Sequence, residues 1–245
     1  MNQESRIKNH QSSITDHEFP IPNPQSPVTN PHPLRYRVTF ATRRTLAYVS
    51  VLELGKIWER SLRRARVPLK YSQGYNPRPK LHFAAPLPVG CGSEADLLDV
   101  WLETPVDPGT ILATLTDTVP PDLSVVDVRA VPEDDAALSE QLIAAEYRVW
   151  LRNAPQDVVE PAVTGFLEST SLLLPKRGRK HRGKTYDLRP LVEALRLEDA
   201  PAPWTGLWMR LQALPGATGR PDEVLKALNF IDVPRRCTRT RLILE

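Results

Sequence analysis

The chain has 245 residues, of which 41% are hydrophobic and 25% are charged, and its formal net charge is +3. The proportions of hydrophobic and charged residues are ordinary for a globular protein. The small net charge excludes a protein that is basic over its whole surface, so any nucleic-acid-binding surface must come from local clusters of charge. The length fits one large domain or two small ones.

Cysteine content and hydropathy narrow the class of protein. The two cysteines, Cys91 and Cys237, are too few for a disulfide framework, and they exclude a cysteine-rich metal or iron–sulfur site made by this chain alone. No run approaches the roughly 20 apolar residues of a membrane span. The N-terminus has no apolar core of the kind found in secretory signals, so the sequence predicts a cytoplasmic protein with no membrane partner.

Residues 1–33 are polar and contain six of the chain's 25 prolines. The few apolar side chains do not offset the entropy lost on ordering, so this segment is predicted to be a disordered leader. Folding is expected to begin at RYRVTFA (35–41), where Tyr36, Val38 and Phe40 alternate with polar residues as in a half-buried strand.

The region that follows predicts the element order β-α-β-β-α-β. A helix begins after Ser50, whose spacing from Glu53 is that of a capping box. A second helix, 107–119, has Asp107 as its N-cap. The expected strands are those at 35–41, 80–90, 95–103 and 123–131. This order is that of a ferredoxin-like unit, which we place at 34–132.

An acidic linker, 133–145, separates this unit from a second, less regular one at 146–245. The pattern restarts there, although Pro161 interrupts the first helix. The expected strands are those at 146–152, 171–175, 185–198 (with a short helix), 207–214 and 237–245, and the expected helices are those at 155–170 and 220–230. The predicted fold class is therefore α+β, with two tandem ferredoxin-like halves after the leader.

The stretch YSQGYNPRPK (71–80) cannot run as a regular helix or strand. Gly74 can take a positive φ, and two X-Pro bonds bias the chain toward extended or turn geometry, which predicts a stiff loop. Tyrosine offers a stacking face and Arg or Lys neutralises phosphate, the usual pairing for single-stranded RNA. The predicted RNA-binding residues of the loop are Tyr71, Gln73, Tyr75, Asn76, Arg78 and Lys80. The alternative is a helix-to-strand connection whose tyrosines pack on the core and whose cations are solvated.

The stretch KRGRKHRGK (176–184) carries six Lys or Arg in nine residues. Charge of a single sign favours a phosphate-binding hairpin over a solvated loop, because like charges repel unless a polyanion joins them. With two helix arginines, the predicted RNA-binding residues outside 71–80 are Arg60, Arg64, Lys176, Arg177, Arg179, Lys180, Arg182 and Lys184. Near the C-terminus, Arg235, Arg236, Arg239 and Arg241 are better explained as a charged face toward solvent.

Catalytic groups are sparse. His82 alternates with apolar residues on a predicted strand and fits a structural histidine, and Glu94, Asp96 and Asp99 are strand carboxylates of a kind that usually faces water. No phosphate-binding, dinucleotide-binding or H-E-x-x-H spacing occurs, and the cysteine triplet of a radical-SAM cluster is missing. The sequence therefore favours a protein that is not an enzyme and predicts no cofactor and no metal.

The residues from 35 to 103 resemble an uncharacterised bacterial family, the radical-SAM-linked domain. The resemblance is carried by WERSLRRARVPLKYSQGYNPRPKLHFAAPLPVG and EADLLDVWL, and KTYDLRPLV and RPDEVLKAL extend it into the second half. At the start of the first helix the family reads S-H-L-D-L, whereas this chain has Val51 in place of the histidine. The resemblance implies a radical-SAM protein as partner, because members are extensions of such proteins or are encoded near them.

These features leave three hypotheses open. The first is a non-catalytic RNA-binding or substrate-presenting accessory of a radical-SAM system, with Arg78 and the cations of 176–184 on phosphate. The second is a protein-interaction module that docks onto the radical-SAM partner without nucleic acid. The third is an enzyme that acts on a nucleoside or modified base through Asp99, Glu94 or His82.

Overall fold

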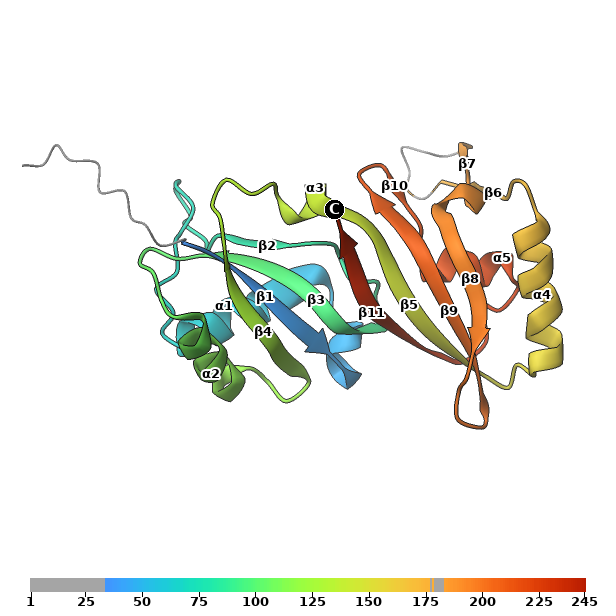
Figure 1. Ribbon diagram of the computed structural model, residues 1–245, viewed down its shortest axis with the longest axis horizontal. Helices are drawn as coiled ribbons and strands as arrows, with labels where there is room; N and C mark the ends of the chain where they lie inside the picture. Colours follow the sequence, from blue (N-terminus) through green and yellow to red (C-terminus); the bar gives the residue numbers. More distant parts are fainter. Residues whose placement is uncertain (1–33, 177, 179–182) are drawn as a thin grey trace, which may run out of the picture. The chain divides into compact units, whose positions relative to one another are not determined.

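The computed structural model describes residues 34–176, 178 and 183–245, so the predicted leader lies outside the described residues. All described residues belong to one compact unit, His32–Glu245. They form a mixed α+β fold built on a nine-stranded mixed sheet with few helices, which confirms the predicted class (Figure 1). None of the helices formed by these residues has the length and hydropathy needed to span a bilayer.

The first part of the sheet comes from the N-terminal elements of this unit. They are β1 (Arg35–Thr42), the 3-10 helix η1 (Arg44–Tyr48), α1 (Val51–Arg64), β2 (Leu81–Phe83), β3 (Cys91–Trp101), α2 (Pro108–Thr118) and β4 (Leu123–Val131). The strands lie in the order β4-β1-β3-β2, and each neighbouring pair is antiparallel. Both α1 and α2 pack on one hydrophobic cluster, in which the rings of Trp58 and Phe40 meet edge to face at 5.1 Å.

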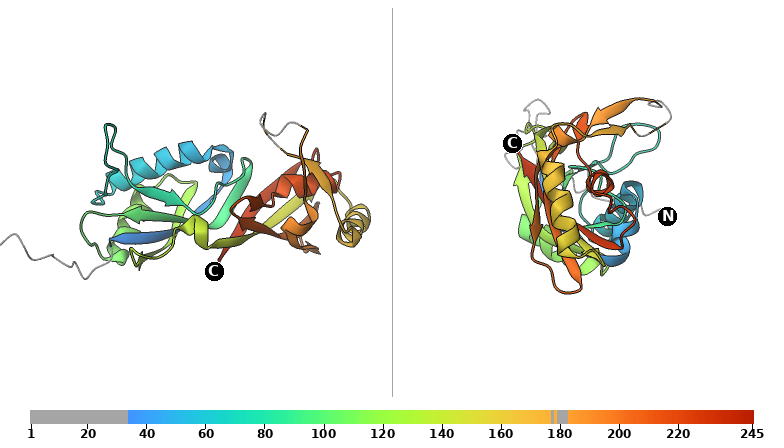
Figure 2. Two further views of the ribbon diagram at one scale, coloured as in Figure 1. Left: turned by 90° about the horizontal axis from the view of Figure 1, so that it is seen from above. Right: turned by 90° about the vertical axis from the view of Figure 1, so that its right-hand side faces the viewer.

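The second part of the sheet comes from the C-terminal elements. They are α3 (Leu138–Gln141), β5 (Leu142–Arg152), α4 (Gln156–Glu168), β6 (Leu173–Pro175), β7 (Thr185–Asp187), η3 (Arg189–Leu191), β8 (Val192–Glu198), β9 (Trp204–Leu214), β10 (Ala217–Thr218), α5 (Pro221–Ala227) and β11 (Arg235–Leu244). Four strands lie in the order β8-β9-β5-β11 with antiparallel neighbours. Strand β10 also pairs with β9, and β6 and β7 form a separate ladder. Helices α4 and α5 pack on a second hydrophobic cluster, on one side of these strands (Figure 2).

Strands β11 and β3 join the two parts of the sheet. They pair in parallel over three residues, with Cys237 opposite Cys91 and Arg239 opposite Ser93. The two cysteines form a disulfide, and their Cα atoms are 4.6 Å apart. Residue spacing did not predict this bond, because 146 residues separate the cysteines and only the sheet register places them side by side.

The predicted helix starts are confirmed. The Ser50 hydroxyl accepts a hydrogen bond from the Glu53 N–H, and the Glu53 carboxylate accepts one from the Ser50 N–H at 2.8 Å, so the capping box is complete. The hydrogen bonds that the Ser50 N–H and the Ser50 hydroxyl donate to this carboxylate lower the pKa of Glu53. At the start of α2, the Asp107 carboxylate accepts from the Thr110 N–H at 2.8 Å. Local sequence signals therefore set where both helices begin.

Two expected boundaries differ from the structure. The strand expected at 80–90 covers only Leu81–Phe83, because the prolines that follow cannot donate ladder hydrogen bonds. The acidic linker expected at 133–145 already contains the start of β5, since Leu142 and Ala144 are buried in the second part of the sheet.

Candidate nucleic-acid interface

Positive charge is concentrated between residues 56 and 80, from the middle of α1 to the start of β2. This basic segment 56–80 holds eight Lys or Arg and one Glu, a balance of +7 in a chain whose net charge is +3. Arg60 and Arg64 are exposed near the end of α1, where cations also complement the helix dipole. Arg64 donates to the carbonyl of Thr118 at the end of α2. The charge is therefore local, as a nucleic-acid surface on a nearly neutral chain requires.

The predicted loop 71–80 is closed by its own backbone. The Ser72 N–H donates to the Arg78 carbonyl at 2.8 Å, and the Lys80 N–H donates to the Lys70 carbonyl at 2.8 Å. The Arg78 N–H also reaches the Ser72 hydroxyl at 3.1 Å. These bonds fix the neck of the loop, so its tip is held in place before any partner arrives.

The tip of the loop presents its side chains to solvent. Gly74 adopts a φ of 141°, which a residue with a side chain rarely takes. The Tyr75 side chain is fully exposed, and Gln73, Asn76 and Arg78 are exposed beside it. For Tyr75, the alternative in which the tyrosines of the loop pack on the core is therefore wrong.

Two predicted residues of the loop already have partners. The Arg63 guanidinium lies 5.8 Å from the centroid of the Tyr71 ring, and its Nε donates to the Tyr71 hydroxyl at 3.2 Å. This hydrogen bond raises the pKa of Arg63. The Lys80 ammonium lies 4.4 Å from the centroid of the Trp101 ring on β3. Both contacts tie the neck of the loop to the fold and leave Tyr75 as the fully exposed ring.

The second predicted basic segment, 176–184, joins β6 to β7. The Lys176 N–H donates to the Lys184 carbonyl at 2.8 Å, and both side chains are exposed. The other predicted cations of the segment lie outside the described residues: Arg177, Arg179, Lys180 and Arg182. Strands β6 and β7 follow α4 in the second part of the fold, so the structure does not bring Lys176 and Lys184, the described ends of the segment, next to the loop 71–80 (Figure 1, Figure 2).

The expectation that the strand carboxylates face water is wrong for Asp99. Its side chain is fully buried and accepts hydrogen bonds from two buried arginines, Arg35 at 2.5 Å and Arg37 at 2.8 Å. Arg35 also donates to the carbonyls of Asp135 and Ala136 in the linker segment. From sequence alone, a charged residue on a strand is expected to face solvent. The arginines that bind Asp99 lie on another strand, so the sequence around Asp99 does not reveal them.

The same expectation is wrong for Asp96, which pairs with Arg239 across the junction of β3 and β11. The Arg239 guanidinium donates to both carboxylate oxygens of Asp96, at 2.7 and 2.8 Å, and both side chains are buried. Burial acts to lower the pKa of Arg239, but the charge of Asp96, together with Tyr147 and the hydrogen bonds to both, outweighs burial and the pKa is raised. Arg239 therefore does not belong to a solvent face, whereas Arg235, Arg236 and Arg241 are exposed as predicted.

The groups of the enzyme hypothesis lie in separate contacts. His82 is half-buried on β2 and lies opposite Asp99 in the sheet register, but the Asp99 carboxylate is held by two arginines. Glu94 pairs with Arg148 at 3.2 Å. Within residues 34–176, 178 and 183–245, no three His, Cys, Asp or Glu side chains are grouped so that they could hold a metal ion.

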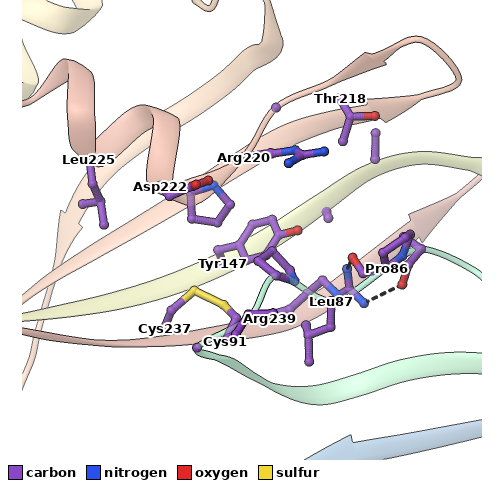
Figure 3. A pocket seen from close by; sticks show the side chains of 18 of the residues that line it. Pro86, Leu87, Cys91, Tyr147, Thr218, Arg220, Asp222, Leu225, Cys237 and Arg239 are labelled. Carbon is purple, nitrogen blue, oxygen red and sulfur yellow. Dashed lines mark hydrogen bonds between the residues drawn. A yellow bond between two sulfur atoms is a disulfide. The ribbon is translucent and has the colours of Figure 1, made fainter. Parts of the chain in front are cut away.

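A pocket of about 1120 Å³ lies beside the junction, between the loop that follows β2 and the start of α5. Figure 3 shows the disulfide of Cys91 and Cys237 near Arg239, with Arg220 and Asp222 across the pocket. The positive charge of Arg239 is already neutralised by its carboxylate partner. None of the predicted RNA-binding residues that the structure describes lines this pocket.

Similarity to solved structures is low. A chain of a Cbf5-Nop10-Gar1 complex has a TM-score of 0.46 and 10% identity, over 84% of this chain and 48% of that chain. The archaeal box H/ACA sRNP Nop10-Cbf5 complex gives 0.43 and 10%, over 94% and 54%. An unknown protein from Galdieria sulphuraria gives 0.23 and 15%, over 84% and 98%. The chain thus spans about half the length of the first two, and scores this low assign neither fold nor function.

Comparison by sequence gives a clearer result. A search of curated proteins finds no match to the chain. The model of one protein family matches residues 35–220, which is most of the chain and includes the basic segment 56–80. The chain therefore belongs to the family described as an uncharacterised protein conserved in bacteria, DUF2344.

Proposed function

We propose that the protein binds RNA through the basic segment 56–80 and acts as a non-catalytic accessory. The observation that carries the proposal is the loop 71–80, which its own backbone closes while Tyr75 and Arg78 stay in solvent, within a segment of balance +7. A stacking ring and a phosphate-binding cation on one support are what binding of single-stranded RNA requires. Because the loop is already ordered, little entropy is lost when it binds.

The side chains divide into roles by chemistry. Arg60, Arg64 and Arg78 would neutralise phosphates, Tyr75 would stack on a base, and the amides of Gln73 and Asn76 would hydrogen-bond to base edges. Lys80 and Tyr71 would act as supports, since each already contacts a neighbouring side chain. The segment 176–184 would add a second phosphate contact from the other part of the fold.

We further propose that each part of the sheet is a ferredoxin-like unit. The strand orders β4-β1-β3-β2 and β8-β9-β5-β11 support this, since each unit follows the chain order β-α-β-β-α-β and has antiparallel neighbours. The second unit adds the ladder β6-β7 and the short strand β10 to that order.

We also propose a radical-SAM protein as the partner, which rests on the sequence resemblance alone. That partner would supply the chemistry, and this chain would present the RNA to it. A docking module without RNA is the second candidate, and the exposed Tyr75 favours it too, because tyrosines are enriched at the energetic centres of protein interfaces.

The test is purification of the protein from its native host at low salt, followed by sequencing of the RNA that remains bound. Three proteins are compared: the wild type, a Tyr75→Ala/Arg78→Ala variant and an Arg129→Ala variant. Arg129 is exposed on β4, outside the basic segment, and serves as the control for loss of one surface charge.

We expect a defined RNA with the wild type and with Arg129→Ala, and its loss from the double variant. Moderate salt should release the RNA, because phosphate contacts release counterions. Wild-type protein that carries no RNA, with a radical-SAM enzyme as its companion at any salt concentration, would overturn the RNA role and favour docking.

A further inference from the structure

The second part of the sheet has one face that α4 and α5 leave uncovered. Tyr147, Val149 and Leu151 of β5 are buried in the cluster on which both helices pack. Side chains alternate along a strand, so the residues between them point to the opposite face, and the same holds for β9 and β11. The aromatic and arginine side chains of this Trp–Arg face are Arg148, Trp150, Arg152, Arg196, Trp204, Trp208, Arg210, Arg236 and Arg241.

The sheet register places these side chains in adjoining rows. One row holds Arg196 of β8, Trp208 of β9 and Arg148 of β5. In the next row, Trp150 lies opposite Arg236 of β11. Rings and guanidinium groups therefore alternate over three strands in the first row and lie side by side on two strands in the second, although the residues come from segments far apart in the sequence.

Three of the arginines lie on rings and pair with no acid. The guanidinium of Arg236 lies 4.7 Å from the centroid of the Trp204 ring, and that of Arg152 lies 6.0 Å from it. The guanidinium of Arg196 lies 4.6 Å from the centroid of the Trp208 ring. Among the residues that the structure describes, these three arginines form no ion pair, so their charges are available to a ligand.

A fourth arginine shows that acids are within reach of this face. Arg148 is bound by Glu94 at 3.2 Å and by Glu198 at 2.8 Å. Glu193 is likewise bound, by Arg210 at 2.8 Å. These ion pairs involve Arg148 and Arg210, so the arginines that lie on rings keep an excess of positive charge on the face.

The corresponding face of the first part of the sheet is covered over the start of β1. Arg35 and Arg37 of β1 point to that face, yet both are buried. The linker segment covers them, since Asp135 and Ala136 accept hydrogen bonds from Arg35, and the Gln141 side chain accepts one from Arg37. The chain therefore covers this part of one sheet face with its own linker, whereas the tryptophans on the other face stay partly exposed.

We infer that the Trp–Arg face is a second binding site for single-stranded RNA, in which bases stack on Trp204 and Trp208 and the unpaired arginines hold the phosphates. A four-stranded sheet with two helices behind it and aromatic side chains in front is a known platform for two or three unstacked bases. Base–aromatic stacking is tolerant of sequence, and arginine adds cation–π contacts and charge. This inference rests on the proposed function for the class of ligand, but it uses different residues.

A single-stranded polynucleotide fits this face better than a protein does. Three unpaired arginines on one sheet face would have to be desolvated in a protein interface, which is costly unless each meets an acid. A polynucleotide brings a phosphate with every base, so each stacked base delivers the matching charge. Duplex RNA does not fit, because its bases are already stacked on one another.

The test measures the affinity of fluorescently labelled single-stranded RNA, about twelve nucleotides long to span one such platform. The variants Trp204→Ala and Trp208→Ala are compared with Tyr48→Ala, which removes an exposed ring on η1, outside the face. Each tryptophan variant should weaken binding on the order of 5- to 150-fold, the range for loss of one stacked base. The control should bind as the wild type does, and duplex RNA of the same length should bind more weakly.

A second set of variants keeps the test valid if a tryptophan variant does not fold. Arg196→Ala and Arg236→Ala change only exposed side chains, and each should make the affinity less dependent on salt. Trp204→Phe should retain most of the affinity, because phenylalanine keeps a stacking ring.

The outcomes separate this inference from the proposed function. Loss of affinity in Tyr75→Ala/Arg78→Ala, with none in the tryptophan and arginine variants, would overturn the Trp–Arg face and leave the proposed function standing. Loss only in the variants of the face would support the inference and overturn the assignment to the loop. Wild-type protein that binds a protein partner through this face, and no RNA, would overturn both.

Discussion

The buried carboxylate of Asp99 allows a sharp prediction, because one acid neutralises two arginines inside the fold. In the variant Asp99→Asn the shape is kept, but Arg35 and Arg37 are left as two buried cations without an anion. Removal of one partner from a buried ion pair costs about 3–5 kcal/mol. Folded domains are stable by only about 5–15 kcal/mol, so this single change should remove a large part of the total.

The assay is equilibrium unfolding in urea, followed by circular dichroism and tryptophan fluorescence. With a slope of about 3 kcal/mol per molar urea, the midpoint should fall by on the order of 1–2 M. The control is Asp127→Asn, the same substitution at an exposed position on β4, which pairs with β1, and it should shift the midpoint little. A midpoint for Asp99→Asn within the error of the control would refute the structural role of the carboxylate.

Three further predictions concern the helix cap, the disulfide and one glycine. Glu53→Ala should lower the free energy of unfolding above pH 4.5. The difference in unfolding free energy from the wild type should shrink as the pH falls through the lowered pKa of Glu53, because the protonated acid no longer makes charge-assisted hydrogen bonds to the helix start. Cys91→Ser removes a disulfide that closes a long loop, so its free energy of unfolding in urea should be lower than that of the oxidised wild type by up to about 5 kcal/mol. It should equal that of the wild type after reduction of the disulfide. Gly206→Ala should lower the melting temperature, because a Cβ there would lie 2.5 Å from the Glu198 carbonyl oxygen, whereas Gly165→Ala, with open space around it, should not.

Much of the secondary structure could be predicted because its signals are local. The capping residues Ser50 and Asp107 predicted where α1 and α2 begin, alternation predicted β1, and the strand expected at 123–131 matches β4. Element ends were less predictable: the start of β5 lies inside a segment whose acidic composition predicted a linker. The composition of a segment describes only residues that are close in sequence. Whether a strand is buried depends on which distant segments the fold packs against it.

The candidate site was predictable only in part, for the same reason. The loop 71–80 is contiguous in sequence, so its stiffness, charge and exposed Tyr75 could be predicted. The two buried acids Asp96 and Asp99 were expected to face water, because their arginines lie far away in the sequence. The Trp–Arg face has the same origin: single tryptophans and arginines on four strands have no pattern until the sheet register aligns them.

The most direct test of RNA binding through the basic segment 56–80 is the salt dependence of affinity for labelled single-stranded RNA. For the wild type we expect the logarithm of the association constant to fall linearly with the logarithm of the salt concentration. Arg78→Ala should weaken binding and reduce the slope by about 0.7, the value for one phosphate contact on a single strand, while Arg129→Ala should change neither. A wild-type affinity independent of salt, or a slope that Arg78→Ala leaves unchanged, would contradict the account.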